Sequence, residues 1–399
     1  MSHLDGSIRG GQKPRATLGS IIYSKTFRTI ATQVVMAALV VMAGLFLYNN
    51  VVENLRAQSI ATGFGFLQQD AQFDIGETPI AYNATDSYAR AFLVGLLNTL
   101  RVSAAGILLA TILGFSVGFA RVSSNWLLSK VATGYVEIVR NVPVILQVIF
   151  WAVVLRNLPG AREAIDFGGF AFLTNRGLSF AVPATDPIHG PIIYACLAGI
   201  VLSILGGYLA RRHREKTGRY ISMLWPSIGL IFGLPALVWL LGGAPTALSV
   251  PALKGFNFRG GVTISPEFTA LLIGIALYAS GFIAEIVRAG LQATPTGQIE
   301  AARSIGLRTR FVMRYVVLPQ ALRVIVPPLT SQYVSLIKNS SIAVVVGYPD
   351  LVNIGNTAMN QTGQAVEAIA VMMMVYLTVS LITSTFMNVY NRLVAIKER

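Results

Sequence analysis

The stretch EAARSIGLRTRFVMRYVVLPQ, from Glu300 to Gln320, is a polar interruption in a chain that is otherwise largely apolar. Its Glu-Ala-Ala start favours a helix, and the glutamate suits the positive end of the helix dipole. Gly306 allows the left-handed turn that ends such a helix. Thr309 can cap a second helix, which must finish near Pro319. The stretch predicts a short helix–turn–helix beside the membrane, with an ordinary amphipathic loop as the alternative.

The composition around this stretch is that of a membrane protein. Of 399 residues, 54% are hydrophobic and 12% are charged, whereas soluble domains carry about 25% charged residues. The net charge of +14 does not indicate nucleic-acid binding, because the basic residues gather in short loops on one side of the spans. The single cysteine, Cys196, excludes an internal disulfide.

About eight apolar segments are long enough to cross the roughly 30 Å hydrocarbon core of a bilayer. They predict an all-α fold, a polytopic bundle of membrane helices, with spans at 29–49, 89–120, 135–155, 191–210, 222–242, 267–288, 323–346 and 365–389. The second span is longer than a bilayer requires. The start of the third is unclear, because Lys130, Glu137 and Arg140 precede its apolar part.

Lysine and arginine predict the orientation of the spans. The N-terminus, the loop RRHREKTGR (Arg211–Arg219) and the stretch after Glu300 are basic, while the loop GYPDLVNIGNTAMNQTGQAVE (Gly347–Glu367) has no lysine or arginine. Both termini are therefore expected in the cytoplasm, although Arg162 and Arg176 lie on the opposite side. The first apolar run is predicted to be an uncleaved anchor.

The spacing of the opening stretch resembles the coupling motif of ABC importer permeases. The motif is Glu-Ala-Ala, three residues, Gly, nine residues, an aliphatic residue, one residue and Leu-Pro. It matches at Glu300, Ala301, Ala302, Gly306, Leu318 and Pro319. Val316 stands where isoleucine is usual.

Three neighbouring segments extend the resemblance to the polar amino-acid branch of these permeases. They are YVEIVRNVPVILQ (Tyr135–Gln147), SGFIAEIVRAGLQATPTGQ (Ser280–Gln298) and PPLTSQYVSLIKNSSIAVVVG (Pro327–Gly347). Val142 departs from the branch, where the first segment more often reads Arg-Gly-Thr-Pro or Arg-Asn-Thr-Pro.

The resemblance also divides the chain. It covers 88–156 and 265–391, which implies a type I ABC importer transmembrane domain over 88–391 with a two-span insertion at about 157–264. Residues 1–87 would form a cytoplasmic N-terminus, a first anchor and a periplasmic loop, and 392–399 a cytoplasmic tail. Extra spans in these places resemble the larger permease subunit of general L-amino-acid importers.

The resemblance implies a multi-pass protein of the bacterial inner membrane that moves L-amino acids by ATP-coupled alternating access. Its partners would be a second related permease, a dimer of cytoplasmic ATPases and a periplasmic amino-acid-binding protein. The stretch after Glu300 would dock into the ATPase, where Arg303, Arg308, Arg310 and Arg314 could pair with acidic groups. These arginines could equally serve only as topology signals.

The sequence itself indicates no cofactor. It contains no G-x-x-x-x-G-K-[ST] stretch to hold phosphates, so ATP and magnesium are expected on the partner ATPase. No cluster of histidine, cysteine and acidic residues suggests a metal site, because His3, His189 and His213 are scattered.

Polar groups inside apolar spans are costly in lipid and are candidates for a substrate pathway. Lys338, Asn339, Ser340 and Ser341 form a polar group in the seventh span, after Pro327 and Pro328 have weakened the helix. A broken helix would offer free backbone groups to a zwitterion. Further candidates are Asn98, Gln147 and Glu285. The alternative is that these groups satisfy one another in a packed bundle, and Glu285 could pair with Arg288.

Two pairs of glycines are expected to let helices approach closely. They are Gly114 with Gly118 and Gly229 with Gly233.

Two other function classes compete with a permease subunit. A secondary transporter driven by an ion gradient could use Glu285 and Lys338 as coupling charges, but no inverted repeat is evident and the stretch after Glu300 would have no purpose. An intramembrane enzyme would need a catalytic constellation such as paired aspartates within spans, and the sequence has none.

Overall fold

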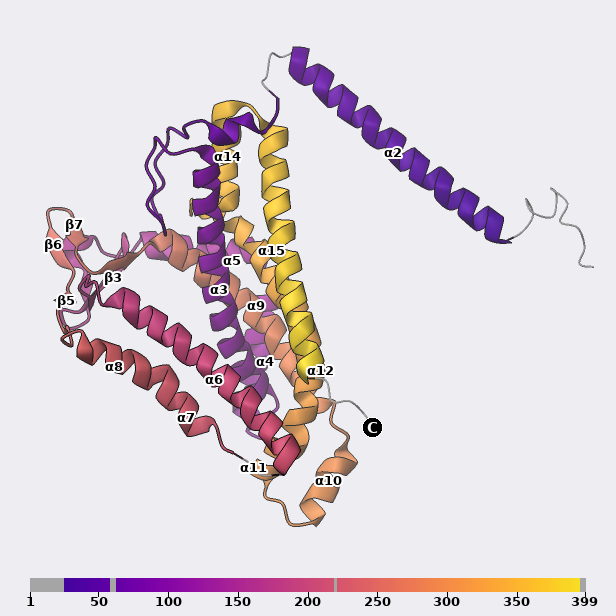
Figure 1. The fold of residues 1–399 in the computed structure, drawn as a ribbon, viewed down its shortest axis with the longest axis vertical. Helices are drawn as coiled ribbons and strands as arrows, with labels where there is room; N and C mark the ends of the chain where they lie inside the picture. The colour runs from indigo at the N-terminus through magenta and orange to yellow at the C-terminus, as the bar shows by residue number, and fades with distance from the viewer. Residues whose placement is uncertain (1–24, 58–61, 219–220, 395–399) are drawn as a thin grey trace, which may run out of the picture.

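The computed structural model describes residues 25–57, 62–218 and 221–394 (Figure 1). Within these ranges seven helices are long and apolar enough to cross a membrane, or eight if one bent pair counts as a single span. This agrees with the predicted number. The chain ends, whose cytoplasmic position was predicted from the charges of the loops and termini, comprise residues 1–24 and 395–399 and lie outside the described residues.

Helices account for most of the described chain. The α-helices are α2 (Lys25–Ala57), α3 (Tyr88–Arg121), α4 (Trp126–Asn141), α5 (Val144–Arg156), α6 (His189–Thr217), α7 (Leu224–Ile228), α8 (Leu234–Leu241), α9 (Pro266–Gln292), α10 (Thr296–Ser304), α11 (Thr309–Val312), α12 (Leu318–Asn339), α13 (Ala343–Val346), α14 (Leu351–Thr362) and α15 (Ala365–Val394). Two π turns (Gly229–Gly233 and Met313–Val317) and three 3₁₀ turns (Phe64–Gln68, Ala161–Glu163 and Ser340–Ile342) accompany them.

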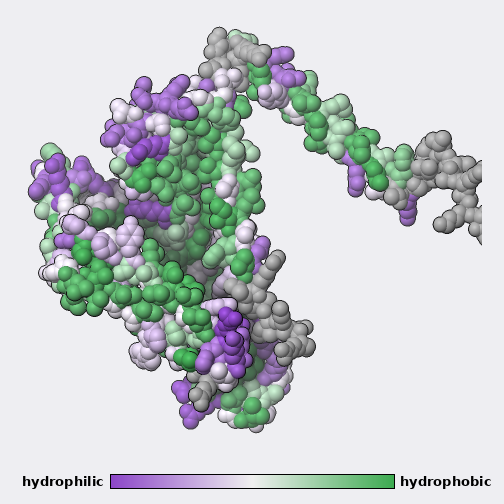
Figure 2. Space-filling model, viewed as in Figure 1, coloured by the Kyte–Doolittle hydropathy of each residue, from purple (hydrophilic) through white to green (hydrophobic). Residues whose placement is uncertain are grey.

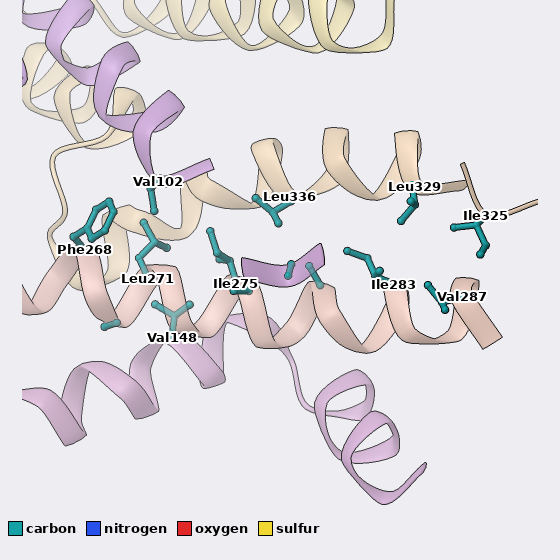
Figure 3. Packing of buried hydrophobic residues seen from close by; sticks show 14 of the residues in the cluster. Val102, Val148, Phe268, Leu271, Ile275, Ile283, Val287, Ile325, Leu329 and Leu336 are labelled. Atoms are coloured by element: carbon teal, nitrogen blue, oxygen red, sulfur yellow. The ribbon is translucent and has the colours of Figure 1, made fainter. Parts of the chain in front are cut away.

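Helix α9 lies at the centre of the bundle. Its side chains Leu271, Ile275 and Ile283 are buried, and the helix packs against α3, α5 and α12. Figure 3 shows Leu336 of α12 and Val148 of α5 on opposite sides of α9. The apolar face of α9 therefore joins three other helices into one core.

Two glycines of α3 allow its close approach to α9. A Cβ atom at Gly114 would lie 2.5 Å from Cγ2 of Ile283, and one at Gly118 would lie 2.7 Å from Cβ of Val287. Cβ atoms in proteins do not lie so close to other side chains, so this helix contact requires glycine at both positions. The predicted packing role of this pair is confirmed.

The second glycine pair does not pack against another helix, and that prediction was wrong. A Cβ atom at Gly229 or Gly233 would meet nothing within 4 Å. These two residues instead bound a π turn between α7 and α8. The close contact in this region belongs to Gly199 of α6, whose Cβ would lie 2.3 Å from the carbonyl oxygen of Leu230.

The predicted third span is two helices rather than one. Helices α4 and α5 meet at an angle of 101°. Pro143 follows Val142, whose backbone is extended (φ −91°, ψ 126°) as a residue before proline prefers. The polar residues that obscured the start of this span belong to α4, and the apolar run belongs to α5.

The segment 157–264 contains two helices long and apolar enough to cross a membrane, as predicted, and three small sheets that were not predicted. Helix α6 packs against α7, the π turn and α8. The strands are β1 (Ile165–Asp166), β2 (Ala171–Thr174), β3 (Gly177–Phe180), β4 (Val182–Pro183), β5 (Leu248–Ser249), β6 (Ala252–Lys254), β7 (Asn257–Arg259) and β8 (Val262–Ile264). In the four-stranded sheet β1-β2-β3-β8, Leu178 pairs with Ile264, just before α9 begins.

The bundle has two distinct ends in Figure 1. We call them the α10 end, which carries α10 and α11, and the α14 end, which carries α14 and the loop 62–87. The basic stretch predicted as a loop is mostly the last two turns of α6 and lies near the α10 end. Figure 2 shows hydrophobic surface along the helices and hydrophilic residues at both ends. Helix α2 stands apart, and its described side chains are exposed or half-buried.

Candidate functional site

Helix α10 ends just before Gly306, at Ser304, and Gly306 makes the left-handed turn that the sequence predicts. Gly306 has φ of +82°, and its N–H donates to the carbonyl of Arg303 at 2.9 Å. The N–H of Leu307 donates to the carbonyl of Ala302 at 3.2 Å. These two bonds form a Schellman motif, which satisfies the last carbonyls of the helix. A Cβ atom at Gly306 would meet nothing within 4 Å, so the positive φ, and not a lack of space, favours glycine here.

The second helix differs from the prediction at both of its ends. Arg308 precedes its first residue, Thr309, and no side chain caps it. The helix does not finish near Pro319 but continues through the π turn Met313–Val317 into α12. Proline has no N–H to bond the carbonyl four residues earlier and its ring would clash there. The wider π turn accommodates this defect, so the chain stays helical.

The segment 300–320 has one buried and one exposed side. Ala302, Val312 and Val317 are buried against the core. Glu300, Ala301, Gly306 and Pro319 are exposed, and Leu318 is half-buried. We call the turn at Gly306, between α10 and α11, together with these two helices, the corner. The corner packs on the bundle with one side and presents a polar outer surface at the α10 end.

The arginines of this segment point away from the core. Arg303, Arg308 and Arg310 are exposed, and none of them forms an ion pair in the part of the chain that the structure describes. Arg310 lies over the ring of Phe311 at 4.6 Å. Their charges are available to another surface.

The polar group of the seventh span lies at a helix break. Lys338 is exposed, Asn339 is half-buried, and Ser340 is fully buried and donates to the carbonyl of Ile337 at 2.6 Å. Ser341 donates to the carbonyl of Lys338 at 2.8 Å. The break is the 3₁₀ turn that begins at Ser340.

The two prolines predicted to weaken this span lie inside a continuous helix α12, so the break was predicted too early in the chain. Ile325, Leu329 and Leu336 of α12 are buried against α9. In lipid an unfolded turn would leave further backbone groups unsatisfied. Packing and the membrane environment therefore outweigh the hydrogen bonds lost at proline.

Gln147 and Asn98 bond to backbone carbonyls. Gln147 donates to the carbonyls of Val139 and Val142 at 2.8 and 3.0 Å, and so bridges the bend between α4 and α5. Asn98 is fully buried and donates to the carbonyls of Glu77 and Pro349, both at 2.9 Å. The structure places Asn98 at the α14 end and Gln147 at the α4–α5 bend, apart in the bundle.

Glu285 sits between two arginines on α9 and α3. Its carboxylate accepts hydrogen bonds from Arg288, at 2.5 Å for the nearest pair of atoms, and from Arg121. The pairing with Arg288 was predicted from the spacing. Arg121 was not predicted, because its contact joins residues far apart in the sequence. The cluster carries two positive charges and one negative charge.

A polar network at the α14 end, part of it buried, was missed. Asp350 is fully buried; it accepts hydrogen bonds from the N–H of Asn353 at 2.9 Å and from the hydroxyl of Tyr376 at 3.3 Å. Beside it, Glu77 pairs with Arg101 at 3.0 Å and accepts from the hydroxyl of Ser265. Asp350 is the sole acidic residue between 347 and 366. An acid directly before an apolar helix is a capping signal, which could have identified it.

Stability is expected to depend on the protonation of Asp350. Burial raises its pKa to about 7, although the backbone N–H of Asn353 favours the charged form. The native side chain therefore holds its proton where an unfolded aspartate has lost it. The contribution of Asp350 to stability is greatest below pH 4 and falls by on the order of 4 kcal/mol as the pH rises to and through 7. The melting temperature of the detergent-solubilised protein should fall between pH 5 and pH 8.

The variant Asp350→Asn keeps the cap and cannot ionise. Its melting temperature should change much less over the same range. An equal slope in both proteins would show that other groups control the pH dependence.

Comparison with known protein families identifies the family of this chain. Residues 103–396 match the family described as the binding-protein-dependent transport system inner membrane component. The chain belongs to this family. It is therefore a membrane-spanning permease subunit of the ABC importer kind, and not an enzyme. The matched range includes the segment 300–320.

Three relatives resemble this permease over nearly their whole length. It is 49% identical to YhdX of Escherichia coli (strain K12), over 100% of both chains; the name of YhdX assigns it provisionally to the amino-acid ABC transporter permeases. It is 43% identical to the general L-amino acid transport system permease protein AapQ of Rhizobium johnstonii, over 95% of both. It is 40% identical to the glutamate/glutamine/aspartate/asparagine transport system permease protein BztB of Rhodobacter capsulatus, over 96% of this chain and 97% of BztB.

Proposed function

We propose that this permease moves L-amino acids into the cytoplasm by ATP-coupled alternating access. The names of AapQ and BztB support the substrate class, since both cover nearly the whole permease. The observation that carries the mechanism is the corner at Gly306, which rests on the core by one side and exposes its other side at the α10 end. The α10 end then faces the cytoplasm, with both chain termini on that side.

The exposed corner would receive a cytoplasmic ATPase. Glu300, Ala301, Ala302, Gly306, Leu318 and Pro319 form the coupling site of this proposal, and Arg303, Arg308 and Arg310 supply positive charge at its surface. ATP and magnesium would be held by a dimer of these ATPases, and this chain would bind no cofactor. A second related permease and a periplasmic binding protein would complete the transporter.

Movement at the corner would reach the spans through the chain itself. Helix α10 follows α9, the central helix, and α11 continues through the π turn into α12. The central helix α9 and its neighbour α12 are thus both joined directly to the proposed coupling segment. Alternating access then needs only a partner that binds the two conformations with different affinity.

Among the pathway candidates, the group at Lys338 fits a polar pathway best. Lys338 is exposed on α12 next to the helix break at Ser340. A charged group exposed within a span is expected to face a partner or water rather than lipid. Asn98, Gln147 and Glu285 are better explained as groups that hold the bundle together.

The function is tested by uptake into proteoliposomes. The vesicles would contain this permease, its candidate partner permease and the ATPase, with ATP sealed inside and the binding protein and labelled amino acids outside. We expect accumulation that requires ATP and stops when a non-hydrolysable analogue replaces it. Uptake that follows a proton or sodium gradient without ATP would overturn the proposal and favour a secondary transporter.

A further inference from the structure

One side chain closes the hydrogen bonds that are open at the bend between α4 and α5. Pro143 has no N–H, so the carbonyl of Val139 lacks the donor that a continuous helix would provide. The N–H of Leu146 would reach Val142 in a continuous helix but donates to the carbonyl of Pro143 instead. The side-chain amide of Gln147 donates to the carbonyls of Val139 and Val142, at 2.8 and 3.0 Å. Two carbonyls freed by the bend are thus satisfied by one group.

The place of Gln147 makes these two bonds important for the bend. Its side chain is 9% exposed, so water has little access to take over its role. Within a membrane span, carbonyls without a donor are costly. Hydrogen bonds weaken steeply as their angle departs from linear. The two bonds therefore favour one angle between α4 and α5, the 101° of this structure.

Both helices of the bend lie on α9 at glycines. A Cβ atom at Gly281 would lie 2.5 Å from Cγ2 of Val139 in α4, and one at Gly274 would lie 2.5 Å from Cγ2 of Val148 in α5. These contacts set how closely each helix approaches α9. They are apolar, and packed helices can slide over such contacts. The angle between α4 and α5 therefore depends more on Gln147 than on α9.

The two helices lead to two places that the proposed function uses. Helix α4 begins at the α10 end, where Leu128 lines one hollow together with Ile299 of α10. Helix α5 packs against α13, which follows the helix break, and Arg156 at its end donates to the carbonyl of Val346 at 3.4 Å. The bend therefore lies between the corner and the group at Lys338.

We propose that Gln147 is a positioning residue for alternating access. It holds α4 and α5 at one angle, so that α5 carries a movement of α4 to the helix break. This rests on the proposed function, in which the corner contacts the ATPase and the group at Lys338 belongs to the pathway. Gln147 itself does not contact the amino acid. A loose bend would leave ATP hydrolysis in place and weaken its coupling to movement at the break.

The first test compares uptake with ATP hydrolysis in the same proteoliposomes. Gln147→Met keeps a long, unbranched side chain but removes the donor. Uptake per ATP hydrolysed should fall about tenfold, the scale expected for the lost hydrogen bonds, while ATP hydrolysis stays within about twofold. Gln147→Asn keeps the amide on a shorter side chain and should give a smaller loss. The control Leu146→Met, at a 53% exposed position of α5, should change neither rate.

The second test measures the bend itself. Spin labels would be attached to Leu127→Cys on α4 and Val153→Cys on α5, which are 62% and 53% exposed. The single native cysteine would be removed by Cys196→Ser. Double electron–electron resonance should show a broader distribution of label distances in Gln147→Met than in the parent permease.

A second label pair separates a loose bend from a general loss of stability. Leu108→Cys on α3 and Leu377→Cys on α15 are exposed positions away from the bend. Their distance distribution should be the same with and without Gln147→Met. Equal distributions for the pair across the bend, or uptake and hydrolysis that fall in equal proportion, would overturn the proposal. Absence of ATP-dependent uptake in the unchanged permease would instead overturn the proposed function, and this proposal with it.

Discussion

Replacing Gly306 with leucine is expected to reduce ATP-dependent uptake at least about tenfold while the transporter still assembles. Gly306 has φ of +82°, a conformation that costs residues with a side chain about 1–2 kcal/mol. Leucine would unwind the Schellman motif and turn α10 away from the position set by Ala302. Uptake would be measured in the proteoliposomes described above, and assembly by size-exclusion chromatography.

The matched control is Gly297→Leu in the same helix. Gly297 lies in the first turn of α10, and a Cβ atom there would meet nothing within 4 Å. Leucine favours helix at this position, so helix stability should hold or rise. Full uptake by Gly306→Leu would show that the shape of the corner does not matter for transport. Equal losses in both variants would assign the effect to surface contacts of α10 instead.

The double change Gly114→Leu and Gly118→Leu is expected to prevent α3 from packing on α9. Even a methyl group at either site would lie within 2.7 Å of Ile283 or Val287. Overpacking costs about 1–3 kcal/mol at each site, and these sites face backbone carbonyls that cannot yield. We expect a large fall in the melting temperature of the purified permease, or no folded protein at all.

A control for added bulk is Gly44→Leu in α2. A Cβ atom at Gly44 would meet nothing within 4 Å, and α2 stands apart from the bundle. The melting temperature of the Gly44→Leu variant should match that of the unchanged permease. If the double variant were equally stable, α3 and α9 would not form the close pair that the structure describes.

The sequence predicts those parts of the fold that depend on local chemistry. Apolar runs of sufficient length predict the membrane helices, because an exposed backbone cannot be satisfied in lipid. Gly306 predicts the end of α10, since only glycine enters the left-handed region without strain. The spacing of the coupling motif predicts the family, and the match over 103–396 agrees.

Features that depend on distant contacts were not predictable in this way. The strands of the insertion have only two to four residues, too few to show a period, and β3 pairs with β8 across more than eighty residues. Arg121 reaches Glu285, and Glu77 reaches Arg101, through folding alone. The continuous helix through Pro327 and Pro328 was missed because local breaking signals do not include packing on α9.

The pairing of Leu178 with Ile264 brings the two ends of the segment 179–263 together. These ends lie one strand spacing apart, about 4.8 Å. The segment between them can therefore grow, shrink or be exchanged without moving the end of α5 relative to the start of α9. A two-residue turn in place of residues 181–261 would reconnect the same sheet. Two membrane spans could thus be gained or lost in evolution while the central bundle kept its shape.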